Sequence, residues 1–428
     1  MCSRSAPSSS GPWVRGEEDG RRSRSHAMAE KRLLILASSY FPEEPSGAAR
    51  LAFDLARGFE QTGCEVWLLV QSRRGETGFC ATDDGLHVLR YHLLPGHGWG
   101  AFRAGQHIRA AKDLMTTYLP AAPDVIHGHD LLPYIAALDL YEASKAMKCY
   151  TVHSPAVEEL PIVWKAEGFL GWPKTLLGLP IIRRYERRAL SVSDRLEAKS
   201  QYTRKLVEAS YGSEIGDRLR IIPGWIEDGR FGVLTPERIR AAREKLGWPH
   251  DKPVLFALRR LESRMGIDTL LKALAILKGE GFDLFASIAG TGSLFPSLLR
   301  LRARLGLDAA VAFMGRLDES DLPLAYGSCD AGVIPTRALE CFGLIALEAM
   351  AAGRPSLVTP VGALPEVVGP FEPAWVAAGN GEYEVAALLR AFLRGEMPSH
   401  RPEDISRYAR SRYGFGAVFP LYRELLGI

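Results

Sequence analysis

The sequence is short of the features that mark several protein classes. Its six cysteines show no C-x-x-C pair and no regular spacing, which argues against a disulfide scaffold or a structural zinc module and favours a reducing cytoplasm. No apolar run reaches the roughly 18 residues of a transmembrane helix. The net charge of +3 is too small to indicate nucleic acid as a partner. We therefore expect a cytoplasmic globular protein, whose 428 residues suggest two domains.

Two signatures of nucleotide and metal chemistry are also missing. The loop at residues 38–50 contains Gly47, where a backbone could approach an anion, but it is not G-x-G-x-x-G, which disfavours a nicotinamide dehydrogenase. The chain has no D-x-D pair to hold a divalent metal on a diphosphate. His127, His129, Asp130 and His153 fit no metal-binding spacing, so they are expected to line a cleft, with a structural role for His127 as the alternative. We expect no metal and no cofactor.

What the sequence does contain is a repeated alternation of strands and helices. The run 32–40 predicts a strand buried on both faces, 47–63 predicts a helix, and the pattern repeats until it becomes irregular near 224–227. A second series of strands and helices then starts at residue 253. This predicts an α/β fold of two Rossmann-like βαβ domains facing each other across a cleft, with ligands at the carboxyl ends of the strands.

The boundaries follow from this pattern. Residues 1–28 are rich in Ser, Arg and Gly and predict a disordered tail. An N-terminal domain is expected over 29–225 and a C-terminal domain over 226–411.

Two glutamates, Glu340 and Glu348, stand on either side of an apolar stretch with seven residues between them. A strand end before them and a helix from about Gly343 would aim Glu340 into the cleft. The backbone amides of Phe342, Gly343 and Leu344 would then be free donors at a helix N-terminus, where phosphate or sugar hydroxyls bind. Glu348, among Leu, Ala and Met, needs a partner such as a pair of sugar hydroxyls. A capping role for Glu340 and a solvated helix face for Glu348 are the alternatives.

Two arginines, Arg260 and Arg264, lie in an expected strand-to-helix loop. Guanidinium groups in such a loop can hold phosphate oxygens bidentately, although loop arginines are more often simply solvated. Without a metal, these arginines and helix dipoles would neutralise a diphosphate. The G-x-G at 290–292 predicts a nucleotide-side loop of low specificity.

The order and spacing of several segments resemble the GT-B glycosyltransferases, most closely the retaining family 4 (group 1) with its E-x(7)-E segment. The resemblance runs from about residue 31 to the end of the chain. The segments that carry it are SGAAR (46–50), VH (152–153), YERRALSVSDRLEAKSQYTR (185–204), IIPGWI (221–226), RMGIDTLL (264–271), GTGS (290–293), MGRL (314–317) and ECFGLIALE (340–348).

The resemblance implies that the domain 29–225 binds the acceptor and is completed by a helix at 412–428, and that the domain 226–411 binds the nucleotide sugar. It also implies a role for each matching residue. Glu340 would contact hydroxyls of the donor sugar near the reacting carbon, Glu348 would bind the ribose, and His153 would contact the donor sugar from the N-terminal domain. Arg260 and the following basic residue would neutralise the leaving diphosphate. The remaining donor contacts would come from Gly47 against the diphosphate, the amides of Phe342, Gly343 and Leu344 at sugar and phosphate, and Arg316 and Leu317 beside the base.

Two positions depart from the family's usual pattern. The family has Lys directly before the Gly of this loop, whereas this chain has Met265, with Arg264 one residue earlier. We expect Arg264 to take over that role. Arg259 stands where Gly is usual, which would alter the local backbone.

The implied reaction is transfer of a hexose from a UDP- or GDP-linked donor to an acceptor hydroxyl on a sugar, glycolipid or natural product. It would be metal-independent, and membership of the family implies that the anomeric configuration is retained. No residue stands out as a covalent nucleophile, so the working hypothesis is a same-face displacement in which the diphosphate takes the acceptor's proton. An inverting route would need a base, for which Asp130 or His153 are candidates, and His129 and Asp130 are expected on the acceptor side. A nucleotide-sugar epimerase and a catalytically degenerate partner protein are the alternatives.

The segment 164–188 mixes Trp, Leu and Arg. This pattern fits peripheral contact with the inner face of the membrane. A packed helix pair that lines the acceptor side is the competing interpretation.

Overall fold

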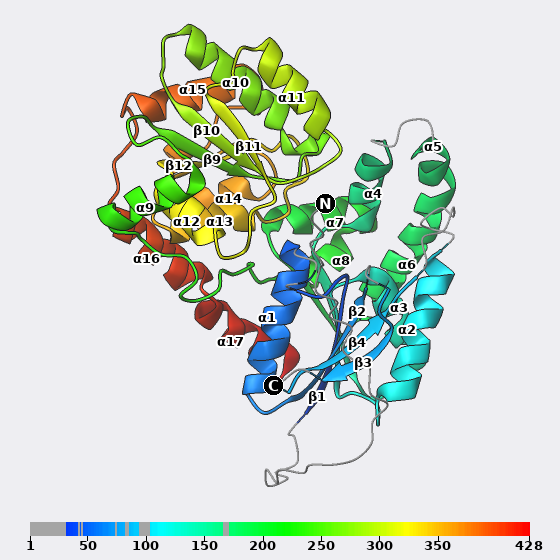
Figure 1. Cartoon of the computed structure of the whole chain (residues 1–428). Coiled ribbons are helices and arrows are strands. Elements are labelled where there is room, and N and C mark those ends of the chain that lie inside the picture. Colours follow the sequence, from blue (N-terminus) through cyan, green and yellow to red (C-terminus); the bar gives the residue numbers. More distant parts are fainter. Residues whose placement is uncertain are drawn as a thin grey trace, which may run out of the picture.

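The computed structural model describes residues 31–41, 43, 46–72, 75–81, 85–93, 103–165 and 171–428. The expected tail at 1–28 lies outside the described residues. Figure 1 shows two α/β bodies, each a twisted sheet with helices on its faces, joined by crossings of the chain. The predicted fold class is confirmed.

The first sheet has eight strands among the described residues, in the order β3-β4-β2-β1-β5-β6-β7-β8. Neighbouring strands run parallel except β3 and β4, which pair antiparallel. The strands are β1 (Arg32–Ala37), β2 (Glu65–Gln71), β3 (Gly78–Ala81), β4 (His87–Tyr91), β5 (Val125–Gly128), β6 (Met147–Val152), β7 (Arg195–Ala198) and β8 (Leu219–Ile221). Its helices are α1 (Gly47–Gln61), α2 (Ala104–Tyr118), α3 (Leu131–Leu140), α4 (Ala156–Lys165), α5 (Gly171–Pro173), the π-helical η2 (Lys174–Gly178), α6 (Leu179–Val192), α7 (Gln201–Tyr211) and α8 (Ser213–Asp217).

The second sheet is parallel, in the order β11-β10-β9-β12-β13. Its strands are β9 (Val254–Leu258), β10 (Phe285–Ala289), β11 (Val311–Gly315), β12 (Ala331–Ile334) and β13 (Ser356–Val358). Its helices are α9 (Pro236–Leu246), η3 (Ser263–Met265), α10 (Ile267–Gly279), α11 (Phe295–Arg304), α12 (Leu322–Ser328), α13 (Leu344–Ala351), α14 (Leu364–Val368), η4 (Pro373–Trp375), α15 (Glu382–Leu393) and α16 (Pro402–Tyr413). They are followed by α17 (Phe415–Leu426), which packs on the first sheet.

The first strand and helix show why this sequence folds as it does. Leu33 to Ala37 of β1 are all buried, because helices cover both faces of a parallel sheet. The Ser46 side chain accepts a hydrogen bond from the Ala49 amide at 3.1 Å and caps α1. The start of α1 is thereby fixed beside the carboxyl end of β1, where ligands bind in such sheets.

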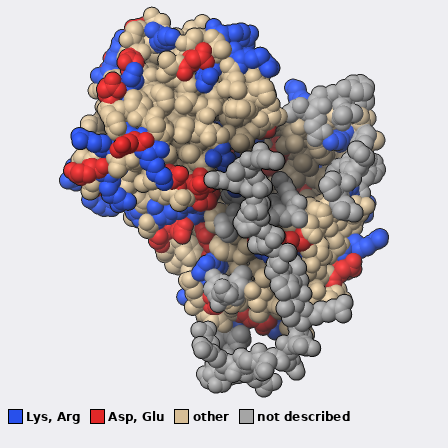
Figure 2. All heavy atoms as spheres, in the orientation of Figure 1, with Lys and Arg blue, Asp and Glu red and all other residues tan. Residues whose placement is uncertain are grey.

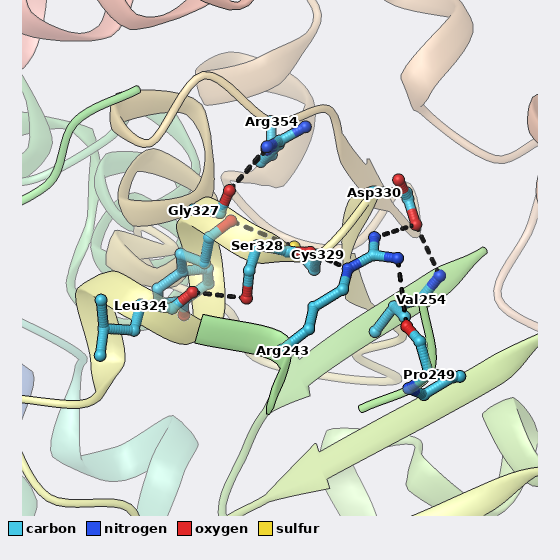
Figure 3. A network of polar contacts seen from close by, with 10 residues as sticks. Arg243, Pro249, Val254, Leu324, Gly327, Ser328, Cys329, Asp330 and Arg354 are labelled. Carbon is cyan, nitrogen blue, oxygen red and sulfur yellow. Dashed lines mark hydrogen bonds and ion pairs between the residues drawn. The ribbon is translucent and has the colours of Figure 1, made fainter. Parts of the chain in front are cut away.

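A buried arginine fixes the first helix of the second body to its sheet (Figure 3). Arg243 of α9 donates from Nε to the Ser328 carbonyl at 2.9 Å and from Nη2 to Asp330 Oδ2 at 2.8 Å. The same carboxylate oxygen accepts from the Val254 amide at 2.6 Å. Helix α9 is therefore linked to the first residue of β9 and to the turn before β12. These contacts align the neighbouring strands β9 and β12.

The last helix returns to the first sheet (Figure 1, red). Val418, Tyr422, Leu425 and Leu426 of α17 belong to the same buried cluster as β1 and α1. A Cβ on Gly58 of α1 would come within 2.6 Å of the α17 side chain at position 415, so the two helices pack closely. The first body therefore contains chain from both sides of the crossing near residue 226.

Two sequence expectations were wrong in detail. The hairpin β3–β4 was not predicted, because its edge strand has only 4 residues. The segment 190–200, predicted as a strand from its start, continues α6 to Val192 before β7 begins. Residues 164–188 are helical where described, and Leu176 and Leu177 of η2 are exposed.

The described helices, the surface charges and the possible metal ligands give few further indications of function. None of the described helices combines the length and the apolarity that a bilayer crossing needs. Figure 2 shows basic and acidic side chains interspersed over the visible face of the second body. The described residues contain no group of three or more His, Cys, Asp or Glu side chains that could hold a metal ion.

Candidate functional site

A cavity of about 1060 Å³ lies between the two bodies, at the carboxyl ends of their strands. The first body contributes the loop after β1, the start of α1 and the end of β6. The second contributes the loops after β9, β10, β11 and β12. Most of the predicted site residues lie on its wall, namely Gly47, His153, Arg260, Arg264, Arg316, Leu317, Glu340, Phe342, Gly343 and Leu344, whereas His129, Asp130 and Glu348 do not.

Glu340 is held by an unusual stretch of backbone. Leu339 is the one non-glycine residue with positive φ (53°) among the described residues, a conformation that costs an L-residue roughly 1–2 kcal/mol. Arg264 Nη1 donates to the Leu339 carbonyl at 2.8 Å. The N-cap of α13 is Gly343, so Glu340 does not cap the helix and its side chain is directed elsewhere.

The Glu340 side chain forms an ion pair with Arg259. Its Nη2 donates to Glu340 Oε2 at 2.6 Å and also to the Thr336 hydroxyl. The Arg259 side chain is 7% exposed and that of Glu340 is 15% exposed. Burial lowers the pKa of the Arg259 guanidinium, while the Glu340 carboxylate acts in the opposite direction. Sequence reasoning treated Arg259 only as a disturbance of the backbone, although a cation at the end of a strand that points into a cleft was a usable signal.

The other two arginines of this loop behave differently. Arg260 is exposed and lies on the cavity wall. Its side chain makes no hydrogen bond or ion pair with any described residue. Arg264 is largely buried, and besides its bond to Leu339 it lies 3.9 Å from Glu159 Oε1 of α4, across the cavity. Arg260 is therefore free to meet a ligand, and Arg264 is engaged in shaping the loop that carries Glu340.

Glu348 is set back from the cavity wall, on α13. Burial raises its pKa to about 7, although Arg50 of α1 and the Tyr326 hydroxyl act to lower it. Glu348 Oε2 and the Tyr326 hydroxyl are both buried, and neither makes a hydrogen bond of normal geometry. Glu348 is thus a carboxyl group short of partners, not a solvated residue on a helix face.

The N-terminus of α13 faces the start of α1. The amides of Phe342, Gly343 and Leu344 have no hydrogen-bond partner among the described residues. Gly343 has φ +93°, a conformation that suits glycine. A Cβ on Gly47 would lie 3.1 Å from Leu344 Cδ1. Free donors and a bare stretch of backbone therefore meet at one end of the cavity, which suits an anionic or hydroxyl-rich ligand.

A row of histidines lies behind the opposite wall. His153 Nε2 lies 3.0 Å from His129 Nδ1. Burial, with the nearby Lys199 cation, holds the pKa of His153 well below its ordinary value, so its ring is neutral at pH 7. His129 sits behind His153, and Asp130 caps α3 by accepting from the Leu132 amide at 3.2 Å.

Lys199 is a cavity residue that sequence reasoning missed. It lies on the wall at the end of β7. Its ammonium group is 3.1 Å from Glu197 Oε1 and also contacts the Tyr422 hydroxyl of α17. Burial lowers the pKa of Lys199 and Glu197 raises it. The lysine thus links the wall of the cavity to the returning helix.

Comparison with known proteins gives two family matches. The family described as "Glycosyltransferase Family 4" matches residues 45–230, and "Glycosyl transferases group 1" matches residues 238–412. A GDP-mannose-dependent monoacylated alpha-(1-6)-phosphatidylinositol monomannoside mannosyltransferase of Corynebacterium glutamicum is 31% identical over 230 residues, which are 52% of this chain and 58% of that protein. The chain spans less than two thirds of the length of such curated relatives.

Solved structures share the fold at low sequence identity. Sucrose-phosphate synthase from Thermosynechococcus elongatus matches with a TM-score of 0.75 and 19% identity, over 93% of this chain and 99% of that one. Anabaena HepE, in a complex with UDP and glucose, matches with a TM-score of 0.68 and 17% identity, over the same shares. With two adjoining family matches that together cover most of its length, on this fold, the chain belongs to the group 1, family 4 glycosyltransferases of GT-B architecture.

Proposed function

We propose that this chain transfers a hexose from a nucleoside-diphosphate donor, bound in the cavity between the two bodies, to an acceptor hydroxyl. The observation that carries the proposal is the cavity's own chemistry. The wall that the second body supplies carries the Glu340 carboxylate, the amides at the start of α13, and Arg260, whose side chain makes no hydrogen bond or ion pair with a described residue. The opposite wall carries the neutral ring of His153. Such a site suits a ligand that has both an anionic diphosphate and a polyhydroxylated ring.

The proposed chemistry breaks the bond between the anomeric carbon and the diphosphate oxygen. The acceptor oxygen forms the new bond to that carbon on the same face, and its proton passes to the departing diphosphate oxygen. Arg260 and the α13 amides would stabilise the negative charge as it develops. Glu340 and His153 would contact the sugar hydroxyls, and Glu348 would accept from the ribose. In a glycosidase, two carboxylates would instead act on either side of the scissile bond. Glu348 cannot be one of such a pair if it binds the ribose.

Donor and acceptor are proposed only as classes. The name of the Corynebacterium relative contains GDP-mannose, and the Anabaena structure holds UDP and glucose, so a UDP- or GDP-linked hexose is supported. The acceptor would be a sugar, a glycolipid or a natural product. Peripheral contact with the membrane stays a prediction, for which the exposed Leu176 and Leu177 beside the arginines of α6 are the supporting observation.

The test is a donor panel read first by thermal shift and then by transfer. We would heat the chain with UDP, GDP, UDP-glucose, UDP-N-acetylglucosamine and GDP-mannose, with and without excess chelator. A ligand that binds only the native state raises stability with the logarithm of its concentration over Kd. A chelator-independent shift with one nucleotide family, followed by transfer to an acceptor with retained anomeric configuration, would support the proposal.

The matched variants are Glu340→Gln and, as a control on the surface, Glu396→Gln. The first should abolish most turnover and leave the nucleotide shift intact, whereas the second should change neither. A product formed without an acceptor would point to the epimerase. The absence of a shift with every donor at millimolar concentration would favour a degenerate partner protein.

A further inference from the structure

We propose that Arg259 is a positioning residue, which holds the Glu340 carboxylate in place and aims it at the donor sugar. This inference rests on the proposed function, and it concerns a position where the chain departs from the common pattern of its family. Arg259 follows the last residue of β9. Its Nη2 donates to Glu340 Oε2 at 2.6 Å, and the Thr336 hydroxyl lies within hydrogen-bonding range of both side chains.

The contact is specific to Arg259. Among the described cations it is the one that makes an ion pair with Glu340. Arg264 Nη1 donates instead to the Leu339 carbonyl, and the Arg260 side chain is exposed at the cavity wall. The carboxylate of Glu340 thus has a single charged partner, and its other oxygen is left for a ligand.

The pair is also rigidly held. The Arg259 backbone packs against Gly290, where a Cβ would come within 1.8 Å of the Arg259 carbonyl oxygen. The Arg259 amide donates to the Ala289 carbonyl at 2.9 Å. Both charged side chains are mostly withdrawn from water. Removing one member of a buried ion pair leaves the other charge uncompensated, which is far more disruptive than loss of an exposed pair.

Two residues of this loop differ from the usual pattern of the family, and the two differences offset each other in charge. The position before Gly266 is the apolar, buried Met265, where a lysine is usual, and the position of a usual glycine is Arg259. Both residues line the cavity. The loop therefore keeps its positive charge but carries it at residue 259, in contact with Glu340. Arg259 Nε is buried and has no hydrogen-bond partner, so the guanidinium has a donor to spare.

The experiment compares Arg259→Gly, Arg259→Lys and the double variant Arg259→Gly/Met265→Lys with the wild-type chain, using the donor that the panel identifies. We expect Arg259→Gly to lower kcat on the order of 100-fold, the size of effect seen when one electrostatic group at a reacting centre is removed. The KM for the donor should stay within about threefold, because Arg260 and the α13 amides remain. Millimolar guanidinium chloride should restore part of the lost kcat. Arg259→Lys, or a lysine regained at 265, should restore part of it too.

A double-mutant cycle with Glu340→Gln separates positioning from general damage. If Arg259 acts through Glu340, then Arg259→Gly should cost almost nothing further in kcat once residue 340 is Gln. The inference would be overturned if the kcat losses of the two single variants multiplied in the double variant. It would also be overturned if Arg259→Gly kept the wild-type kcat and did not respond to guanidinium. In both cases the proposed function would still stand. A wild-type chain that transfers from no donor would instead overturn the proposed function, and this role with it.

Discussion

Replacing Glu348 by Gln should make the protein more stable at alkaline pH and a poorer binder of nucleotide. The Glu348 pKa of about 7, against an ordinary value of 4.5, means that the native state holds this proton more tightly than the unfolded chain does. The free energy of unfolding therefore falls as the pH rises from about 4.5 to 7. At about 1.4 kcal/mol for each pKa unit, the full effect is about 3 kcal/mol.

The side chain of Glu348 keeps some contact with solvent, which lowers the expected gain to about 1–2 kcal/mol. Gln has the same shape and no proton to lose. Glu348→Gln should therefore match the wild-type chain below pH 4.5 and exceed it in stability above pH 7.

The assay is urea unfolding of both chains at pH 5 and pH 8, with Glu396→Gln as the surface control. A gain at pH 8 that shrinks at pH 5 supports the reasoning. An equal difference at both pH values, or a loss of stability at pH 8, would refute it. The same variant should bind the nucleotide at least tenfold more weakly at pH 8, because the carboxylate that would accept from the ribose hydroxyls is gone.

Three further substitutions test the geometry of the site. Gly47→Val should raise the donor KM several-fold, because its side chain would press on Leu344 across the cavity, whereas Gly105→Val, at an open site on α2, should not alter KM. Leu339→Gly should be more stable than Leu339→Ala by about 1 kcal/mol in urea unfolding, because residue 339 has positive φ. Elsewhere an Ala variant is usually more stable than a Gly variant, and finding that order here would count against the strained backbone. Arg260→Ala should lower kcat/KM on the order of 100-fold with an unchanged Tm, since its exposed side chain makes no hydrogen bond or ion pair with a described residue. A large fall in Tm would show that the arginine is structural.

Sequence patterns brought most of the candidate site residues to one cavity because strand ends in parallel sheets meet at one edge. His153 follows β6 and Glu340 follows β12 by a short loop, and both reach the cavity from different bodies. The periodic segments likewise predicted the two sheets, except for the hairpin β3–β4, whose edge strand β3 has only 4 residues.

The partners of the charged residues could not be predicted in the same way. The bond between Arg259 and Glu340 joins positions 81 residues apart, and the bond between Lys199 and Tyr422 spans 223. Neither leaves a periodic signal, since each depends on how two loops or helices dock. The same is true of Glu348, whose apolar surroundings showed that it needs a partner but not how far it stands from the cavity wall.

The return of α17 to the first sheet sets an order on the assembly of the molecule. On the ribosome, residues 32–221 emerge with their sheet complete, but the apolar groove that Tyr422 and Leu425 fill is still open. The second body is synthesised in between, so it can fold on its own while the first waits for its last helix. The cavity wall at Lys199 is finished only when Tyr422 arrives. A chain that ends early would therefore contain two recognisable domains, yet it would lack a completed ligand site.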